Sequence, residues 1–179
     1  VLAEIFDVFK NRIQYRYLDP IARISRGDTY LGEGFSIVSL ICSMIEALQT
    51  ARDGKVYFKA APRGNYENQF ELYGDGCSRF IFTKFLNGQH PFKQYFNDGL
   101  SDDFYANVRC SILHEAMVRN GWRIRVDTNV MISMMGGIKI VNRDLLLEGL
   151  NDYLKSYETQ FFKCVNLQNN LISKINLIS

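Results

Sequence analysis

The sequence has no hydrophobic run long enough to cross a membrane, few prolines and little excess charge. Its most apolar stretch, residues 35–48, is interrupted by serines and closes on Glu46, whereas a membrane-spanning helix needs about 20 apolar residues. We therefore expect a soluble, cytoplasmic protein. With three prolines, 13 glycines and 47% hydrophobic residues, the composition is neither disordered nor collagen-like. A net charge of +2 excludes a protein that coats nucleic acid through general basicity, so any RNA binding must be local.

Metal and cofactor sites also find little support. Four cysteines lie far apart without a CxxC pair, and His90 and His114 are the two histidines. This set leaves few ligands for zinc and is typical of reduced thiols rather than of a disulfide scaffold. The chain lacks a GxxxxGK[ST] phosphate loop, a dinucleotide-binding fingerprint, HExxH and GxSxG. We expect neither a metal nor a cofactor.

The hydrophobic periodicity predicts a mainly α protein, a helical bundle formed by one domain over residues 1–179. Apolar residues recur every three or four positions in four expected helices, over residues 2–17, 35–50, 77–86 and 101–119. The first is expected to end at Asp19-Pro20, because proline disfavours helix in the preceding residue. A small β-hairpin is expected over about 122–141, around Gly136-Gly137.

The C-terminal segment, about 143–178, carries a heptad-like seam of apolar residues. The seam predicts one long helix of roughly 45 Å at 1.5 Å per residue. Such a helix would extend beyond a compact body of this size, so its far end would need a second copy of the protein. The alternative is two helices broken near residues 166–170.

Arg109 and His114 are the residues best suited to chemistry, and both fall on the helix expected over 101–119. On a helical wheel Arg109 lies within the apolar arc, where a guanidinium needs an anion because it is not deprotonated in proteins. That anion is Glu46, another carboxylate or a ligand phosphate. His114 lies on the opposite side, and its imidazole can exchange a proton near pH 7. The alternatives are a structural Arg–Glu pair and a surface histidine without a role.

The spacing Arg109-x-x-x-x-His114 resembles the R-x4-6-H motif of the HEPN superfamily, over about residues 103–122. Members are small helical bundles, many of them metal-independent ribonucleases of toxin–antitoxin and phage-defence systems, with the site at a dimer interface. The resemblance implies that His114 acts as acid–base on the ribose 2′-hydroxyl or the leaving oxygen, while Arg109 stabilises charge on the phosphate. It also implies products with a 2′,3′-cyclic phosphate and a 5′-hydroxyl. Cys110 departs from the family pattern, which often has Asn, Asp or His after the arginine.

On an ideal helix, five positions place the two side chains about 140° apart. They therefore meet only through a kink, through the length of the arginine, or across a homodimer. We expect Asn107, Ser111 and Glu46 to support the site through helical geometry. Three further residues are expected to hold the RNA backbone or to form a solvated face: Arg119, Arg123 and Arg125. An antitoxin or regulatory protein is a further expected partner.

The alternative function is a catalytically inactive HEPN-like module that serves as a regulatory, nucleotide- or protein-binding dimerisation domain. Cys110 favours this alternative, whereas the retention of both Arg109 and His114 favours the nuclease. The nuclease interpretation fails if Arg109 is bound to an internal acid and the imidazole of His114 faces solvent away from any partner.

Overall fold

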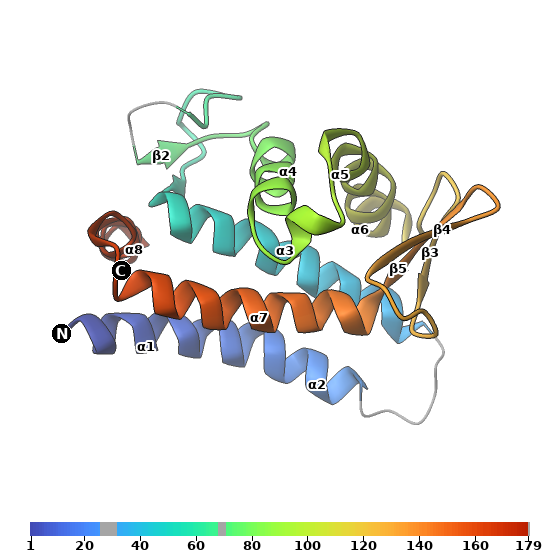
Figure 1. The fold of residues 1–179 in the computed structure, drawn as a ribbon. Coiled ribbons are helices and arrows are strands. Elements are labelled where there is room, and N and C mark those ends of the chain that lie inside the picture. Colours follow the sequence, from blue (N-terminus) through green and yellow to red (C-terminus); the bar gives the residue numbers. More distant parts are fainter. Residues whose placement is uncertain (26–31, 68–70, 179) are drawn as a thin grey trace.

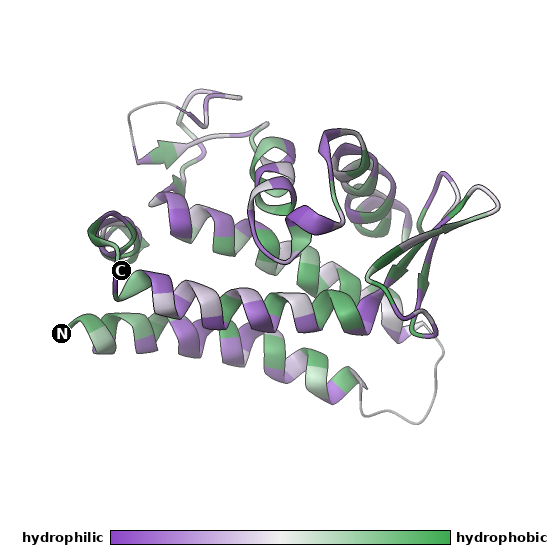
Figure 2. Cartoon of the chain, in the orientation of Figure 1, coloured by the Kyte–Doolittle hydropathy of each residue, from purple (hydrophilic) through white to green (hydrophobic). Residues whose placement is uncertain are grey.

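The computed structural model describes residues 1–25, 32–67 and 71–178, and the chain is mainly helical, as its periodicity predicts. Figure 1 shows α7 (Arg143–Phe161) lying along α1 (Leu2–Ile13) and α2 (Asp19–Ser25), with α3 (Glu33–Asp53) behind them. A small sheet closes one end of the bundle, and α8 (Val165–Ile178) lies at the other end, next to both termini. Hydrophobic and hydrophilic residues alternate along α1 and α7 (Figure 2), as expected of helices buried on one side only.

The central element of the core is α3. It is longer than the apolar stretch of residues 35–48, and by length and composition alone its 21 residues could cross a membrane, but 56% of that apolar window is buried inside the fold. Its side chains are buried around most of the helix: Ile37, Val38, Ile41, Cys42, Met44, Ile45, Leu48 and Ala51. Neighbouring helices cover α3 on nearly every side, which accounts for its mostly hydrophobic composition.

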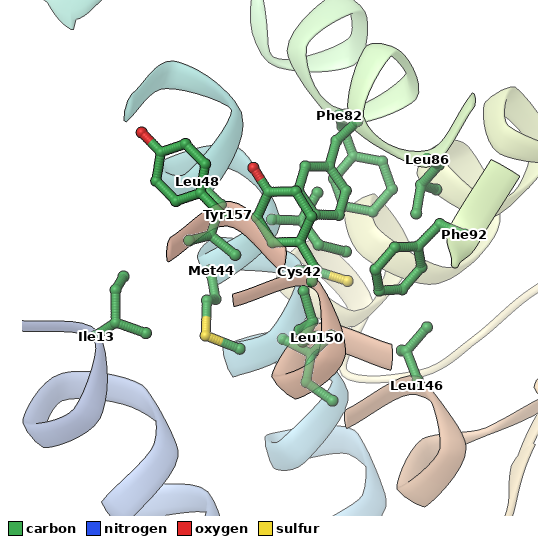
Figure 3. Close-up of a cluster of buried hydrophobic side chains, with 14 of the residues drawn as sticks. Ile13, Cys42, Met44, Leu48, Phe82, Leu86, Phe92, Leu146, Leu150 and Tyr157 are labelled. Carbon is green, nitrogen blue, oxygen red and sulfur yellow. The ribbon is translucent and has the colours of Figure 1, made fainter. Parts of the chain in front are cut away.

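The main hydrophobic cluster joins α3 to the helices around it. In Figure 3, Leu146, Leu150 and Tyr157 of α7 face the α3 side chains, and Ile13 approaches from α1. Phenylalanines close the other side of the cluster, from α4 (Ser78–Gly88) and the 3₁₀ turn η2 (Phe92–Gln94). A second, smaller cluster of Tyr66, Cys77 and Ile81 lies apart from it. The short parallel pair β1 (Val56–Tyr57) and β2 (Leu72–Tyr73) completes this part of the fold.

The N-terminal helix does not end at Asp19-Pro20, as expected, but continues into α2. Between α1 and α2 lies a π-helical turn, η1 (Gln14–Leu18), in which the N–H of Asp19 bonds to the carbonyl of Gln14. The wider turn leaves room for the proline ring, and Pro20 falls in the first turn of α2, where its missing N–H costs little.

The helix that carries the motif is irregular. It begins with Asn97 as its cap, earlier than expected, because the Asn97 side chain accepts an N–H of the first turn. Ser101, where the helix was expected to begin, is instead buried inside it. The helix ends sooner than residue 119, at Ala116 in the left-handed region (φ 54°). Its three parts are α5 (Asp98–Phe104), the π-helical η3 (Tyr105–Cys110) and α6 (Ser111–Glu115).

The expected hairpin over 122–141 is part of a three-stranded sheet with the order β3-β5-β4. Its strands are β3 (Trp122–Arg125), β4 (Ile132–Met135) and β5 (Ile138–Asn142). The antiparallel pair β4–β5 is the hairpin itself, and Gly136 and Gly137 form its two-residue turn with φ of 55° and 79°. Periodicity did not predict that β3 would pair with β5 in parallel.

The C-terminal segment forms two helices, α7 and α8, which meet near residues 162–164 rather than 166–170. The apolar seam continues across this break, but α8 turns back onto the bundle. The side-chain amide of Asn170 donates to the carbonyl of Arg52 at 2.8 Å, and Leu171 is fully buried. Leu171 of the seam is therefore covered within one chain and does not require a second copy, whereas the last seam residue, Ile178, is 47% exposed.

Candidate functional site

Arg109 is paired with Glu46. The carboxylate oxygen Oε1 of Glu46 accepts from Nη2 of Arg109 at 2.7 Å and from Nε at 2.9 Å. The two side chains are 19% and 18% exposed, so the pair lies at the edge of the core, between η3 and α3. The anion expected for Arg109 is thus a carboxylate of the same chain. The first of the two conditions stated against the nuclease interpretation, an Arg109 bound to an internal acid, is therefore met.

The pairing leaves part of the guanidinium unused. A guanidinium has five N–H groups. Glu46 accepts from one on each of two nitrogens, and the sulfur of Cys110 accepts from one on Nη1, so two remain. Nη1 lies 3.9 Å from the sulfur of Cys110, and the ring of Tyr105 lies 5.3 Å from the guanidinium carbon. Burial lowers the pKa of Arg109, but Glu46 and Tyr105 outweigh it and raise the pKa overall. The side chain is therefore charged and oriented at neutral pH.

The groups around the pair are neutral at pH 7. Burial raises the pKa of the Cys42 thiol, which lies one turn from Glu46 on α3. Burial also raises the pKa of Tyr105 to about 12, and burial followed by the charge of Glu46 does the same for Tyr73. The Arg109–Glu46 pair therefore has no competing charge from these three groups.

His114 lies on the exposed side of α6, near its C-terminal end. Its imidazole makes no hydrogen bond or ion pair with any residue that the structure describes. The flanking Leu113 and Met117 are 51% and 50% exposed. Within one protomer, Arg109 points toward α3 while His114 faces outward, so the chain alone does not bring the two side chains together. The imidazole of His114 thus faces solvent in the single chain, as in the second condition against the nuclease interpretation, and that interpretation depends on a partner copy.

Asn107 and Ser111 are engaged in bonds within their own helix. The side-chain amide of Asn107 donates to Asp103 at 2.9 Å, and the hydroxyl of Ser111 donates to the carbonyl of Ala106 at 3.2 Å. Of the proposed supporting residues, only Glu46 contacts Arg109.

Asp103 is a residue whose role the sequence did not reveal. Its carboxylate accepts hydrogen bonds from Asn107, Asn120, Trp122 (2.7 Å) and Lys139 (2.5 Å). Burial raises its pKa, but the bonds from Lys139, Trp122 and Asn120 outweigh burial and lower the pKa overall. Asp103 thereby ties the end of α5 to β3 and β5. In the helix expected over 101–119 it fell in the first turn, where an acid is common for electrostatic reasons, so sequence alone gave no signal of this network.

The three arginines expected to hold RNA differ in their surroundings. Arg119 pairs with Glu115 at 3.1 Å, and Arg125 forms two contacts with Asp127. Arg123 is exposed and has no ion pair among the residues that the structure describes. It lines a hollow of about 340 Å³ on the outer face of the sheet, beside Arg125 and Ile140. Arg123 is therefore the one of the three whose charge is not already neutralised.

No protein-family model matches the chain, and no curated protein or solved structure is significantly similar to it. Within the described residues, no group of three or more His, Cys, Asp or Glu side chains is arranged to hold a metal ion. The resemblance to the HEPN superfamily accordingly depends on residues 103–122.

Proposed function

We propose that this protein is a metal-independent endoribonuclease that acts as a homodimer, with His114 as the acid–base and Arg109 as the group that stabilises the phosphate. The observation that supports it is the state of these two side chains. The same continuous helix carries an imidazole open to solvent and a charged guanidinium that Glu46 orients while two of its N–H groups remain unused. Since one protomer keeps the two side chains apart, the proposal requires a second copy to bring them together.

The reaction needs no group beyond these side chains. His114 takes the proton of a ribose 2′-hydroxyl, whose oxygen attacks the adjacent phosphorus, and the bond to the 5′-oxygen breaks. The leaving oxygen takes a proton from an imidazolium, leaving a 2′,3′-cyclic phosphate and a 5′-hydroxyl. Arg109 stabilises the extra negative charge on the phosphate oxygens in the transition state. A dimer supplies two imidazoles, one for each proton transfer.

A dimer also accounts for the surface around His114. Leu113 and Met117, which are close to His114 in the sequence, are large apolar side chains that are half exposed. A second copy that covers them would place its own His114 near the first, and would exclude water from the reacting phosphate. An antitoxin or regulatory protein that covered the same residues would block the site.

A second candidate is the catalytically inactive regulatory or dimerisation module. The Arg109–Glu46 pair favours it, since an arginine satisfied by an internal carboxylate is what a purely structural residue would show. Cys110, which replaces the usual polar residue of the motif, favours it as well.

Incubation with a mixed-sequence RNA in excess EDTA distinguishes the two. The nuclease releases fragments that end in a 2′,3′-cyclic phosphate, and His114→Ala abolishes them. His90→Gln is the matched control, because His90 is also exposed but lies outside the motif, and this variant keeps full activity. Absence of cleavage by a folded dimer, cleavage that persists in His114→Ala, or cleavage only with added Mg²⁺ rejects the nuclease.

A further inference from the structure

A hollow of about 140 Å³ lies between the N-terminal helix, α3 and α8, away from the motif. Its apolar lining comes mainly from Phe9, Ile13, Tyr17, Leu171, Ile175 and Ile178. Three cationic side chains complete the lining: Arg12 and Arg16 from the N-terminal helix and Lys174 from α8. None of the described residues that line it is acidic.

Among the residues that the structure describes, Arg12 and Arg16 have no counter-ion. Arg12 is half-buried and Arg16 is exposed, and neither forms an ion pair or side-chain hydrogen bond with a residue that the structure describes. They lie four positions apart on one helix, where like charges repel each other. Part of the helix between them is the π-turn η1, an irregularity that is frequent at functional sites.

Lys174 adds a third charge that burial disfavours. Its ammonium donates to the hydroxyl of Thr50 at 2.7 Å and to the carbonyl of Lys55 at 2.9 Å, which leaves one N–H. Burial lowers its pKa to about 8, and the more distant charge of Asp53 opposes that change only in part. An anion placed against Lys174 would stabilise its charged form.

We propose that this hollow binds a small organic anion, with its charged group against Arg12, Arg16 and Lys174 and its apolar part on Leu171 and Ile175. Positive charge without a carboxylate selects an anion, because guanidinium groups bind carboxylates and phosphates through charge-assisted hydrogen bonds. The apolar lining selects an organic anion over a bare inorganic one, since burial of its hydrocarbon part adds to the binding. The site is independent of the proposed nuclease activity.

The test is a titration of the full chain with hexanoate at pH 7, followed by NMR shifts of backbone amides. Hexan-1-ol serves as the uncharged probe and inorganic phosphate as the probe without an apolar part. We expect hexanoate to bind at least about tenfold more tightly than either, with the largest shifts in α1, η1 and α8. Equal binding of hexanoate and hexan-1-ol, equal binding of hexanoate and phosphate, or shifts confined to other surfaces overturns the proposal.

Variants link the binding to the named charges. Arg16→Glu reverses an exposed charge with little risk to folding and is expected to weaken hexanoate binding by about tenfold or more. Arg12→Gln removes the half-buried charge and is expected to act in the same direction. Lys163→Ala is the matched control, since Lys163 is exposed and lies outside the lining. An Arg16→Glu variant that binds hexanoate as tightly as Lys163→Ala contradicts the proposed site.

Discussion

A single carboxylate oxygen of Glu46, on the central helix, accepts from both Nε and Nη2 of Arg109, on the motif helix. The contact joins two elements separated by more than sixty positions in the sequence. It also holds the guanidinium in one orientation, with Nη1 directed toward Cys110. An RNA phosphate would either use the remaining N–H groups or displace Glu46.

Glu46→Gln separates the structural and catalytic roles of this pair. Loss of the carboxylate leaves Arg109 partly buried without its counter-ion, and we expect the free energy of unfolding to fall by about 1–3 kcal/mol. If Arg109 binds RNA, the freed guanidinium also lowers the KM for RNA, because no carboxylate competes with the phosphate. Urea unfolding measures the first effect, and cleavage kinetics measure the second.

Arg109→Lys provides the matched comparison. Lysine keeps the charge but loses the planar, two-pronged geometry, so cleavage should fall by at least about tenfold while the fold persists. Unchanged cleavage in Arg109→Lys would contradict a role of Arg109 at the phosphate, and it would leave Glu46 as its structural partner only.

Arg123 and Arg125, the two arginines of β3, should contribute unequally to RNA binding. Arg123→Ala removes a charge with no ion-pair partner among the described residues, so RNA affinity should fall several-fold and the slope of log affinity against log salt should decrease by about 1. Arg125→Ala should have a smaller effect, since Asp127 already neutralises this arginine. Both affinities are measured with His114→Ala, so that the RNA stays intact. Equal effects of the two substitutions would contradict the assignment.

Because of Asp103, we expect the free energy of unfolding to depend on pH in the acidic range. Its pKa is lowered in the folded protein, so its ionised form stabilises the fold at pH values above its unfolded pKa of about 3.9. This stabilisation disappears as the pH falls through the lowered folded pKa. We expect Asp103→Asn to lose about 1–3 kcal/mol at pH 7, and the difference from the unsubstituted protein to shrink below about pH 4. Urea unfolding across pH measures it, with exposed Asp152→Asn as the control. A constant difference at all pH values would exclude ionised Asp103 as the cause.

The sequence predicted elements where one local pattern dominates and missed those set by contacts between distant segments. The helix over 35–50, the short helix ending at Gly88 and the turn at Gly136-Gly137 follow from periodicity and glycine placement. The parallel pairing of β3 with β5 does not, because neither strand carries information about its neighbour. The N-terminal helix continues through Pro20 because a π-helical turn precedes this residue. No pattern in the sequence predicts such a turn.

In the candidate site, too, local patterns predicted some features, and contacts between distant segments determined the rest. A helical wheel located Arg109 in an apolar arc and Glu46 as one of its candidate anions, and the structure pairs them. The hydrogen-bonding role of Asp103 was not predicted. Its partners Trp122 and Lys139 lie on strands whose positions depend on the whole fold. The heptad seam over 143–178 predicted apolar contacts, but the sequence could not decide whether a second copy or α3 supplies them.

Gly54 determines how closely α8 approaches α3. It ends α3 with φ of 68°, and a Cβ there would lie 3.0 Å from the Cα of Asn170. Gly54→Ala therefore combines left-handed strain with a backbone contact, and we expect it to lower the free energy of unfolding by about 2 kcal/mol. Gly88→Ala is the control, because a Cβ there meets nothing within 4 Å. A small effect of Gly54→Ala in thermal unfolding would mean that α8 docks less tightly than described.

The exposed apolar residues beside His114 test whether two copies form the site. Leu113→Glu with Met117→Glu places like charges on both sides of a homodimer interface, and we expect the dissociation constant of the dimer to rise by about a hundredfold or more. Cleavage should be lost with the dimer, since each protomer separates Arg109 from His114. Val165→Glu is the control, because Val165 is also largely exposed but lies on α8. Sedimentation equilibrium gives the association state, and the RNA assay is run on the same samples. A double variant that is monomeric and still cleaves RNA at the original rate would show that one protomer contains the complete site.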